Sequence, residues 1–251
     1  MRASVTSVVL TGVEAIPCRV EVALLEERTP KTTIVGLPDA AVRESIERVR
    51  AAMAACALPY PPGRVTISLA PAALKKEGPR YDLPMAIALL IASGHLGPDT
   101  NQRMRDIIMV GELALDGSVK SVRGAVAVAD LARQQHIGEV ILPESVAGFG
   151  ALVSRVRVLG VSTLMEAVQY LTGRRVLKPA VPVPCAEPSP LMDLENLRGQ
   201  RGARRALLVA AAGWHNLLMV GPPGAGKTTL ARCLPGILPS PQASEALELA
   251  R

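Results

Sequence analysis

Aromatic residues are scarce in this sequence: they make up 2% of 251 residues, with one Trp and one Phe. Proteins that hold single-stranded nucleic acid commonly stack its bases on Phe, Tyr or Trp side chains. The composition therefore excludes a base-stacking platform. Any contact with nucleic acid has to be electrostatic.

Cysteine is also sparse and scattered. The four residues Cys18, Cys56, Cys185 and Cys233 form no CxxC pair and no cluster with histidine. This spacing argues against a disulfide framework and against a zinc site. We expect free thiols in a reducing cytoplasm.

Long apolar runs are missing as well. The longest, residues 84–92, is about half the length that a bilayer requires, and residues 1–10 lack the apolar stretch and cleavage site of a signal peptide. We expect a cytoplasmic protein with no membrane contact. An apolar share of 49% still provides a packed core.

Charge is unevenly distributed along the chain. The net charge is +6, but residues 1–172 carry 18 basic and 17 acidic side chains, whereas residues 173–251 carry 10 and 5. A basic tail permits contact with the phosphates of a nucleotide or a nucleic acid, and an ordinary solvated basic face explains it equally well.

Residues 1–172 alternate β-rich runs with Ala-rich helical runs, which indicates one α/β or α+β domain. A helix is expected over residues 39–55, capped by Asp39, and a closing helix over residues 162–171, capped by Ser162. A hairpin is expected at Asp116-Gly117. Strands are expected over 5–10, 19–25, 32–35, 65–69, 106–110, 113–115, 139–142 and 155–159, and further helices over 84–93 and 124–135.

Prolines mark a change of composition after this domain. Five of them fall within residues 178–190, and proline stiffens an extended chain. We therefore expect a linker over residues 173–192 and a second domain over residues 193–251. In that domain a helix is expected over 201–212, a strand over 216–220 and another helix over 229–234.

Residues 221–228, Gly-Pro-Pro-Gly-Ala-Gly-Lys-Thr, match the pattern G-x-x-x-x-G-K-[ST] between that strand and helix. Glycines let the backbone curl so that N–H groups point at phosphate oxygens, and a helix N-terminus adds its positive end. We therefore expect an ATP site. The residues expected to bind it are Gly221, Pro222, Pro223, Gly224, Ala225, Gly226, Lys227, Thr228 and Thr229.

Two side chains of the loop have specific expected roles. Lys227 would contact the β- and γ-phosphates, and the hydroxyl of Thr228 would bind Mg²⁺. Hydrolysis also requires an acidic residue after a second strand, and the 23 residues after Thr228 contain no such strand. We expect a truncated chain that binds ATP, lacks catalytic residues and does not hydrolyse ATP alone.

Four blocks closely resemble the ComM/YifB family of magnesium-chelatase-like AAA+ proteins. They are residues 34–39 (Ile-Val-Gly-Leu-Pro-Asp), 69–84, 111–117 (Gly-Glu-Leu-Ala-Leu-Asp-Gly) and 213–228. The resemblance covers residues 5–239. It implies an α/β protein with a front domain similar to the Lon protease (ribosomal S5 domain 2-like), and then the start of a P-loop AAA+ domain. Residues 197–200 match the family's adenine-side segment.

The similarity to Lon raises the question of peptidase activity. The resemblance aligns Arg80 with the nucleophilic serine and Val126 with the partner lysine, and neither side chain can serve in covalent hydrolysis. Ser68, Ser93 and Lys120 are better explained as strand, helix-end and turn residues. We expect a non-proteolytic domain. Lys75, Lys76 and Arg80 could face DNA or a neighbouring subunit, and a solvated turn is the alternative.

The resemblance further implies a hexameric ring and an ATP-dependent helicase that drives DNA branch migration in natural transformation. Two other functions stay open. One is a chelatase-type motor subunit that remodels a protein partner, and the other is a stand-alone interaction scaffold.

Overall fold

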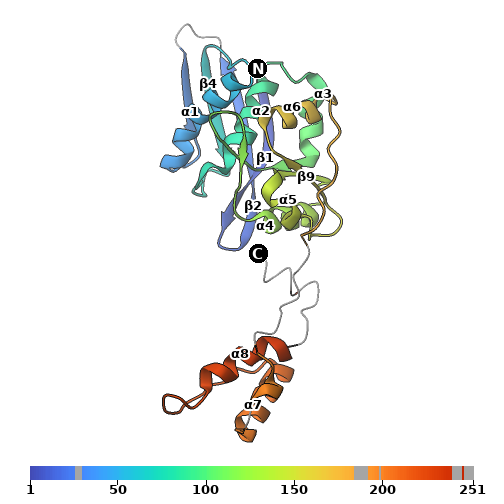
Figure 1. Cartoon of the computed structure of the whole chain (residues 1–251). Coiled ribbons are helices and arrows are strands. Elements are labelled where there is room, and N and C mark those ends of the chain that lie inside the picture. The colour runs from blue at the N-terminus through green and yellow to red at the C-terminus, as the bar shows by residue number, and fades with distance from the viewer. Residues whose placement is uncertain (26–29, 184–191, 198, 239–244, 246–251) are drawn as a thin grey trace. The chain divides into compact units, whose positions relative to one another are not determined.

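The computed structural model describes residues 1–25, 30–183, 192–197, 199–238 and 245. The chain divides into two compact units, one over residues 1–183 and a second after it (Figure 1). Each unit is described by itself. Cys185 and three of the five linker prolines, Pro184, Pro188 and Pro190, lie outside the described residues.

The first unit is built on a seven-stranded mixed sheet with the strand order β3-β4-β2-β1-β5-β8-β9. The β1–β2 and β2–β4 pairs are antiparallel and the other four pairs are parallel. Its strands are β1 (Arg2–Thr11), β2 (Glu14–Leu25), β3 (Lys31–Val35), β4 (Arg64–Ala70), β5 (Ile107–Met109), β8 (Glu139–Pro143) and β9 (Arg157–Val161). The α/β fold class expected from the sequence is confirmed.

Side chains of the first strands alternate between the core and the outside, because successive residues of a strand point to opposite faces. Val20 and Val22 of β2 and Ile67 of β4 are at most 1% exposed, whereas Glu21, between the two valines, is exposed.

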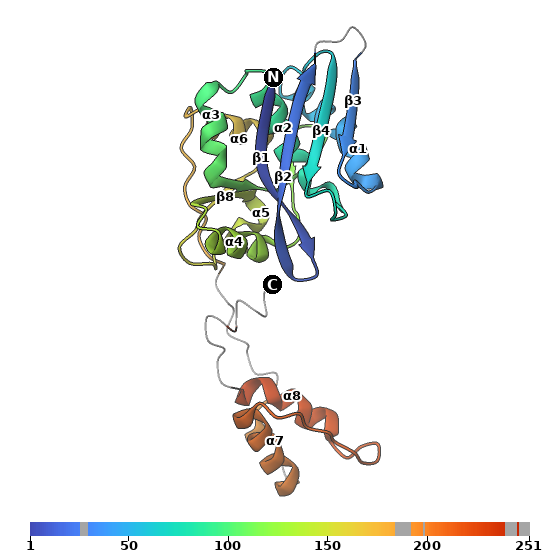
Figure 2. The ribbon, with the colours of Figure 1, turned by 180° about the vertical axis from the view of Figure 1, so that it is seen from behind.

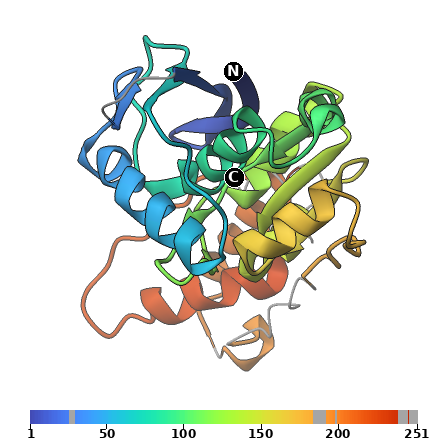
Figure 3. The same ribbon diagram turned by 90° about the horizontal axis from the view of Figure 1, so that it is seen from above.

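Three helices line the inner face of this sheet: α1 (Ala40–Ala55), α2 (Asp82–Ala92) and α6 (Leu164–Leu171). Figure 3 shows them on the same side of the strands. Helix α2 is buried over nearly its whole length, because it packs on β1 and β2 and also against α1 and α6. Asp39 caps α1 as expected, since its carboxylate accepts the N–H of Val42 at 2.8 Å.

Helices α4 (Ala125–Gln134) and α5 (Glu144–Gly150) pack against β8, with α5 also on β9 and α4 also on β2.

The upper part of β1, β2, β4 and β3 faces the viewer in Figure 2, with α1 and α2 behind it.

Several boundaries differ from the sequence-based prediction. Thr163, rather than Ser162, caps α6, because its side chain accepts the N–H of Glu166 at 3.1 Å. The helices α3 (Pro98–Arg103) and α5 were not predicted. The expected hairpin is present as β6 (Glu112–Leu113) and β7 (Val119–Lys120), and three-residue 3-10 turns lie at Pro79–Tyr81 (η1), Met104–Asp106 (η2) and Leu194–Asn196 (η3).

The chain after α6 stays on the first unit as far as Val183. Leu177 is buried, Ala180 donates its N–H to Val158 O at 2.8 Å, and Val183 donates to Gly148 O at 3.1 Å. Residues 173–183, assigned to the linker from their composition, thus cover the edge of β9.

The second unit contains α7 (Arg201–Gly213) and α8 (Lys227–Ile237). Leu194, Leu207, Leu230 and Cys233 form its small core. The strand expected over residues 216–220 is wrong: residues 215–222 form no strand in the structure. A strand needs a hydrogen-bonding neighbour, and residues 192–197 and 199–238 include no second strand. Leu218 and Val220 are therefore 87% exposed.

Candidate functional site

The phosphate-loop sequence forms a turn that leads directly into α8. Gly224 and Gly226 have φ values of +80° and +77°, a region that side chains other than glycine rarely adopt. Ala225 donates its N–H to Pro222 O at 3.3 Å, and Gly226 is the N-cap of α8. The backbone path thus explains why glycine occupies positions 224 and 226.

Helix α8 begins at Lys227, so Lys227, Thr228 and Thr229 form its first turn. The N–H groups of a helix's first turn have no partner within the helix and carry its positive dipole end. Thr228 is exposed at this end. The loop and the helix end therefore present donors and one hydroxyl on a single short stretch.

The ammonium group of Lys227 lies on the loop itself. It donates hydrogen bonds to Gly221 O and Pro222 O, both at 2.8 Å. The backbone carbonyls at the start of the loop therefore hold the cation that was expected to contact phosphates. A bound anion would compete with these carbonyls for the lysine.

Gln200 and Arg204 connect the loop to the segment that precedes α7. The amide nitrogen of Gln200 donates to Ala225 O, and Nη1 of Arg204 donates to Leu197 O at 3.2 Å. The expected adenine-side segment is thus in contact with the loop, although its Arg198 lies outside the described residues. Arg204 was not predicted as a site residue from the sequence. Its position one helical turn after Gln200 is the pattern that could have indicated it.

A cavity of about 170 Å³ lies between this segment and the loop. It is smaller than the roughly 300–1,000 Å³ of a pocket for a drug-sized ligand. Among its lining residues Arg204 is charged and none is acidic. The lining residues are Leu197, Gly199, Gln200, Arg204, Gly224, Ala225, Gly226, Thr229 and Leu230.

The residues of the second unit fit a nucleotide phosphate group. The loop supplies backbone N–H groups, the end of α8 supplies a positive dipole, and Lys227 supplies a cation that other oxygens already bind. Mg²⁺ prefers oxygen ligands and retains several waters, and the exposed Thr228 can offer one oxygen. The described residues include no cluster of three His, Cys, Asp or Glu side chains able to hold a metal alone.

The basic cluster expected at Lys75, Lys76 and Arg80 is wrong as a single exposed patch. Lys76 is 0% exposed and donates to Pro71 O and to Leu74 O, and its burial lowers its pKa. Lys75 is exposed, but it pairs with Glu77 at 2.9 Å. One guanidinium nitrogen of Arg80 is buried. Lysine spacing alone does not reveal that a side chain turns inward.

The residues considered for peptidase chemistry are distributed over the first unit. Ser68 lies on the outer side of β4, and Ser93 follows α2 and donates to Leu89 O at 2.8 Å. Lys120 is exposed in β7, and Val126 is buried in α4. Cys18, Cys56 and Cys233 are free thiols. Within the described ranges, no helix reaches the length and hydropathy that crossing a bilayer demands.

Comparison with known proteins links both units to one family. The family model described as subunit ChlI of Mg-chelatase matches residues 20–146, and the model for magnesium chelatase, subunit ChlI, matches residues 193–251. The uncharacterized protein YifB of Salmonella typhimurium is 41% identical over 239 residues, which are 95% of this chain and 46% of YifB. The competence protein ComM of Haemophilus influenzae is 41% identical over 246 residues, 95% of this chain and 47% of ComM. The chain spans about half the length of these relatives.

Proposed function

The chain belongs to the ComM/YifB family of magnesium-chelatase-like AAA+ proteins, and from this membership we propose that it binds ATP and Mg²⁺ at residues 221–228. We further propose that the nucleotide serves an ATP-driven ring motor, a hexamer, that acts on DNA. The observation that carries the proposal is the glycine loop that ends in the N-terminus of α8, where Lys227 is the first helical residue and its ammonium group lies on the loop.

Each residue of the loop has a defined task in this proposal. Gly224 and Gly226 allow the left-handed turns that point backbone N–H groups at the phosphates. Lys227 would exchange the carbonyls of Gly221 and Pro222 for phosphate oxygens, and Thr228 would contribute its hydroxyl to Mg²⁺. Bound Mg²⁺ would neutralise phosphate charge. Pro222 and Pro223 would restrict the loop, and Ala225 and Thr229 would border the phosphates.

The organisation that supports this function has three parts. We propose a non-proteolytic domain similar to that of Lon over the first unit, a proline-rich connection after Val183, and an AAA+ segment over residues 193–251. The support for the last part is the ChlI model that matches residues 193–251.

The first experiment tests nucleotide binding by the chain. Titration with a fluorescent ATP analogue and Mg²⁺ is expected to saturate, and Lys227→Ala is expected to weaken binding by about tenfold to a hundredfold, since charge-assisted hydrogen bonds contribute about 1.5–3 kcal/mol each. Arg205→Ala is the matched control, because Arg205 is an exposed cation of α7 outside the loop. Equal affinity of Lys227→Ala and the parent chain would exclude the loop as the phosphate site.

The second candidate function is a chelatase-type motor subunit that remodels a protein, which the description of the matching family favours. Binding of fork- or branch-shaped DNA separates the two functions. A DNA motor is expected to bind such DNA with strong salt dependence. A chain that binds ATP but no DNA would support the chelatase-type function.

A further inference from the structure

The outer side of β1, β2, β4 and β3 forms what we call the open sheet face. The strand register places Arg2 beside Ala23 and Ala23 beside Thr66, and it places Ser4 beside Glu21 and Glu21 beside Ser68. Helices α1 and α2 cover the opposite side of these strands (Figure 2). The side chains of this face are Arg2, Ser4, Thr6, Arg19, Glu21, Ala23, Leu25, Lys31, Thr33, Val35, Arg64, Thr66, Ser68 and Ala70.

Basic and hydroxyl side chains dominate the open sheet face. Four of its side chains are basic, five carry hydroxyls, and Glu21 is the one acid among those named above. The rest of residues 1–172 carries 14 basic against 16 acidic residues, so the positive charge of the first domain is concentrated here. Arg2, Arg19 and Lys31 are exposed, and none of them has an ion pair within the described ranges.

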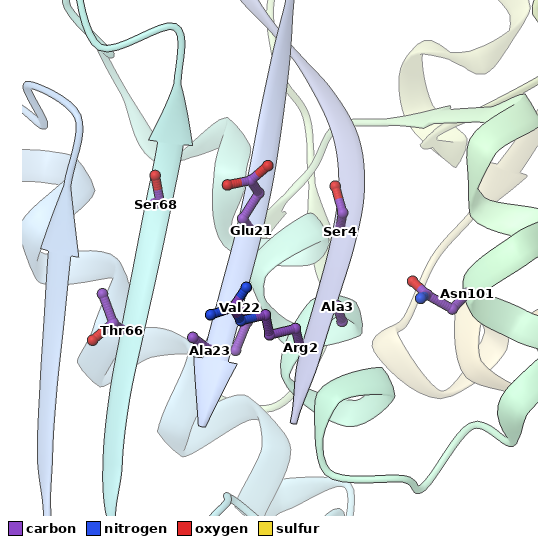
Figure 4. Close-up of a pocket in the computed structure, with 9 residues that line it drawn as sticks. All are labelled: Arg2, Ala3, Ser4, Glu21, Val22, Ala23, Thr66, Ser68 and Asn101. Carbon is purple, nitrogen blue, oxygen red and sulfur yellow. The ribbon is translucent and has the colours of Figure 1, made fainter. Parts of the chain in front are cut away.

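A cavity of about 390 Å³ lies at the end of this face that Arg2, Ala23 and Thr66 form. Figure 4 shows Ser4, Glu21 and Ser68 side by side on three strands, with Asn101 of α3 approaching from one flank. Guanidinium, hydroxyl and amide groups are the side-chain groups that usually contact the phosphates and sugars of nucleic acids. With no aromatic side chain among those of the open sheet face, it is suited to a backbone rather than to stacked bases.

We propose that the open sheet face binds the phosphate backbone of DNA, which extends the proposed function and rests on it. Four strands at about 4.8 Å spacing span about 14 Å, which corresponds to about four nucleotide steps of 3.4 Å. The charge of the face selects this occupant. A second copy that used the same face would bring arginine against arginine, and like charges in contact oppose association.

The main test compares two triple variants of the chain. Arg2→Ala/Arg19→Ala/Lys31→Ala removes three cations of the open sheet face, and Arg43→Ala/Arg123→Ala/Arg174→Ala removes three exposed cations elsewhere. Fluorescence anisotropy with labelled duplex and forked DNA at 50–200 mM salt measures affinity. The first variant is expected to bind at least about tenfold more weakly at 50 mM salt, and its slope of log K against log salt is expected to fall by up to about 2.7, since each phosphate contact contributes about 0.9. The second variant is expected to keep both values.

A charge-removing change at Glu21 tests the same surface in the opposite direction. Glu21→Gln keeps the size of the side chain and is expected to strengthen DNA binding by about twofold to fivefold, because it removes a repulsion from phosphates. Circular dichroism and thermal melting check that each variant is folded.

Three results would overturn the proposal. One is equal DNA affinity and equal salt slope for both triple variants. This result would not bear on ATP binding at the loop, which is measured separately. Another is no DNA binding by the parent chain, which would refute the DNA part of the proposed function too. The last is loss of self-association in the first variant, measured by sedimentation, without change in DNA affinity, which would make this face a contact between copies.

Discussion

Loss of either partner of the ion pair between Arg48 of α1 and Asp82 of α2 is expected to destabilise the first unit. Nε of Arg48 donates to Oδ2 of Asp82 at 2.8 Å and Nη2 donates to Oδ1 at 3.3 Å, and the N–H of Leu113 donates to Oδ2 at 3.2 Å. The Asp82 side chain is 0% exposed and the Arg48 side chain 22%. One carboxylate thus connects two helices and β6.

Asp82→Ala is expected to lower the free energy of unfolding by about 3 kcal/mol. Removal of one partner of a buried ion pair destabilises by about 3–5 kcal/mol, and the partial exposure of Arg48 lets water solvate its freed charge. For a unit of this size the melting temperature should fall by about 6–12 °C, at about 2–4 °C per kcal/mol. Differential scanning calorimetry or urea titration measures both quantities.

Arg48→Met tests the same pair through its pH dependence. Burial raises the pKa of the Asp82 carboxyl, although the hydrogen bonds from Arg48 and the N–H of Leu113 oppose the rise. Without Arg48 the pKa should rise further, so the folded state holds a proton that the unfolded state releases above about pH 4. Stability then falls as pH rises. We expect the deficit of Arg48→Met relative to the parent chain to be larger at pH 7.5 than at pH 4.5.

Glu47→Ala is the matched control, because Glu47 is 76% exposed and forms a surface pair with Arg50 at 3.4 Å. Such pairs contribute at most about 1 kcal/mol. The reasoning is refuted if Asp82→Ala and Glu47→Ala have the same stability, or if the deficit of Arg48→Met does not grow with pH.

Three further predictions concern other positions of the first unit. Burial raises the pKa of the Cys18 thiol from 9.0 to about 11. Because the unfolded chain loses this proton first, the free energy of unfolding should fall by about 1.4 kcal/mol per pH unit between pH 9 and 11. Urea titrations measure this slope, and Cys18→Ala should reduce it. Gly36→Ala should lower the free energy of unfolding by more than about 2 kcal/mol, because φ is +107° and an added Cβ would lie 2.2 Å from Leu69 O. Gly78→Ala should lower it by only about 1–2 kcal/mol, because φ is +76° but the space around an added Cβ is open. Equal melting temperatures of the two variants would contradict this. Lys76→Met should lower stability by about 1–3 kcal/mol, since the partly buried carbonyls of Pro71 and Leu74 lose their donor. It should leave the salt slope of DNA binding unchanged.

Much of the first unit follows from local sequence patterns. Alternating apolar residues predict β2 and β4, and Asp39 before a run with helical spacing predicts α1 and its cap. Helix α5 was missed because its seven residues include two glycines and few charges, so that no periodic pattern marks it. Tertiary contacts decide such short elements.

The candidate site could be predicted only in part. The spacing of its glycines predicts a loop before α8, and the structure has that loop. The bonds from Lys227 to two loop carbonyls and from Gln200 to Ala225 O depend on how side chains fold back in space. For the same reason lysine spacing predicted an exposed cluster where Lys76 is buried. The strand over residues 216–220 was predicted from its apolar residues, but pairing depends on a neighbour that the local pattern does not specify.

The attachment of residues 177–183 to the first unit has a mechanical consequence. A pulling force that reaches Val183 from the following chain acts first on its hydrogen bond to Gly148 O and then on the bond from Ala180 to Val158 O. Leu177 anchors this stretch behind them. Tension between the two units is therefore carried by β9 and α5, and the hydrogen bonds in the interior of the sheet bear load only after this short outer segment has peeled away.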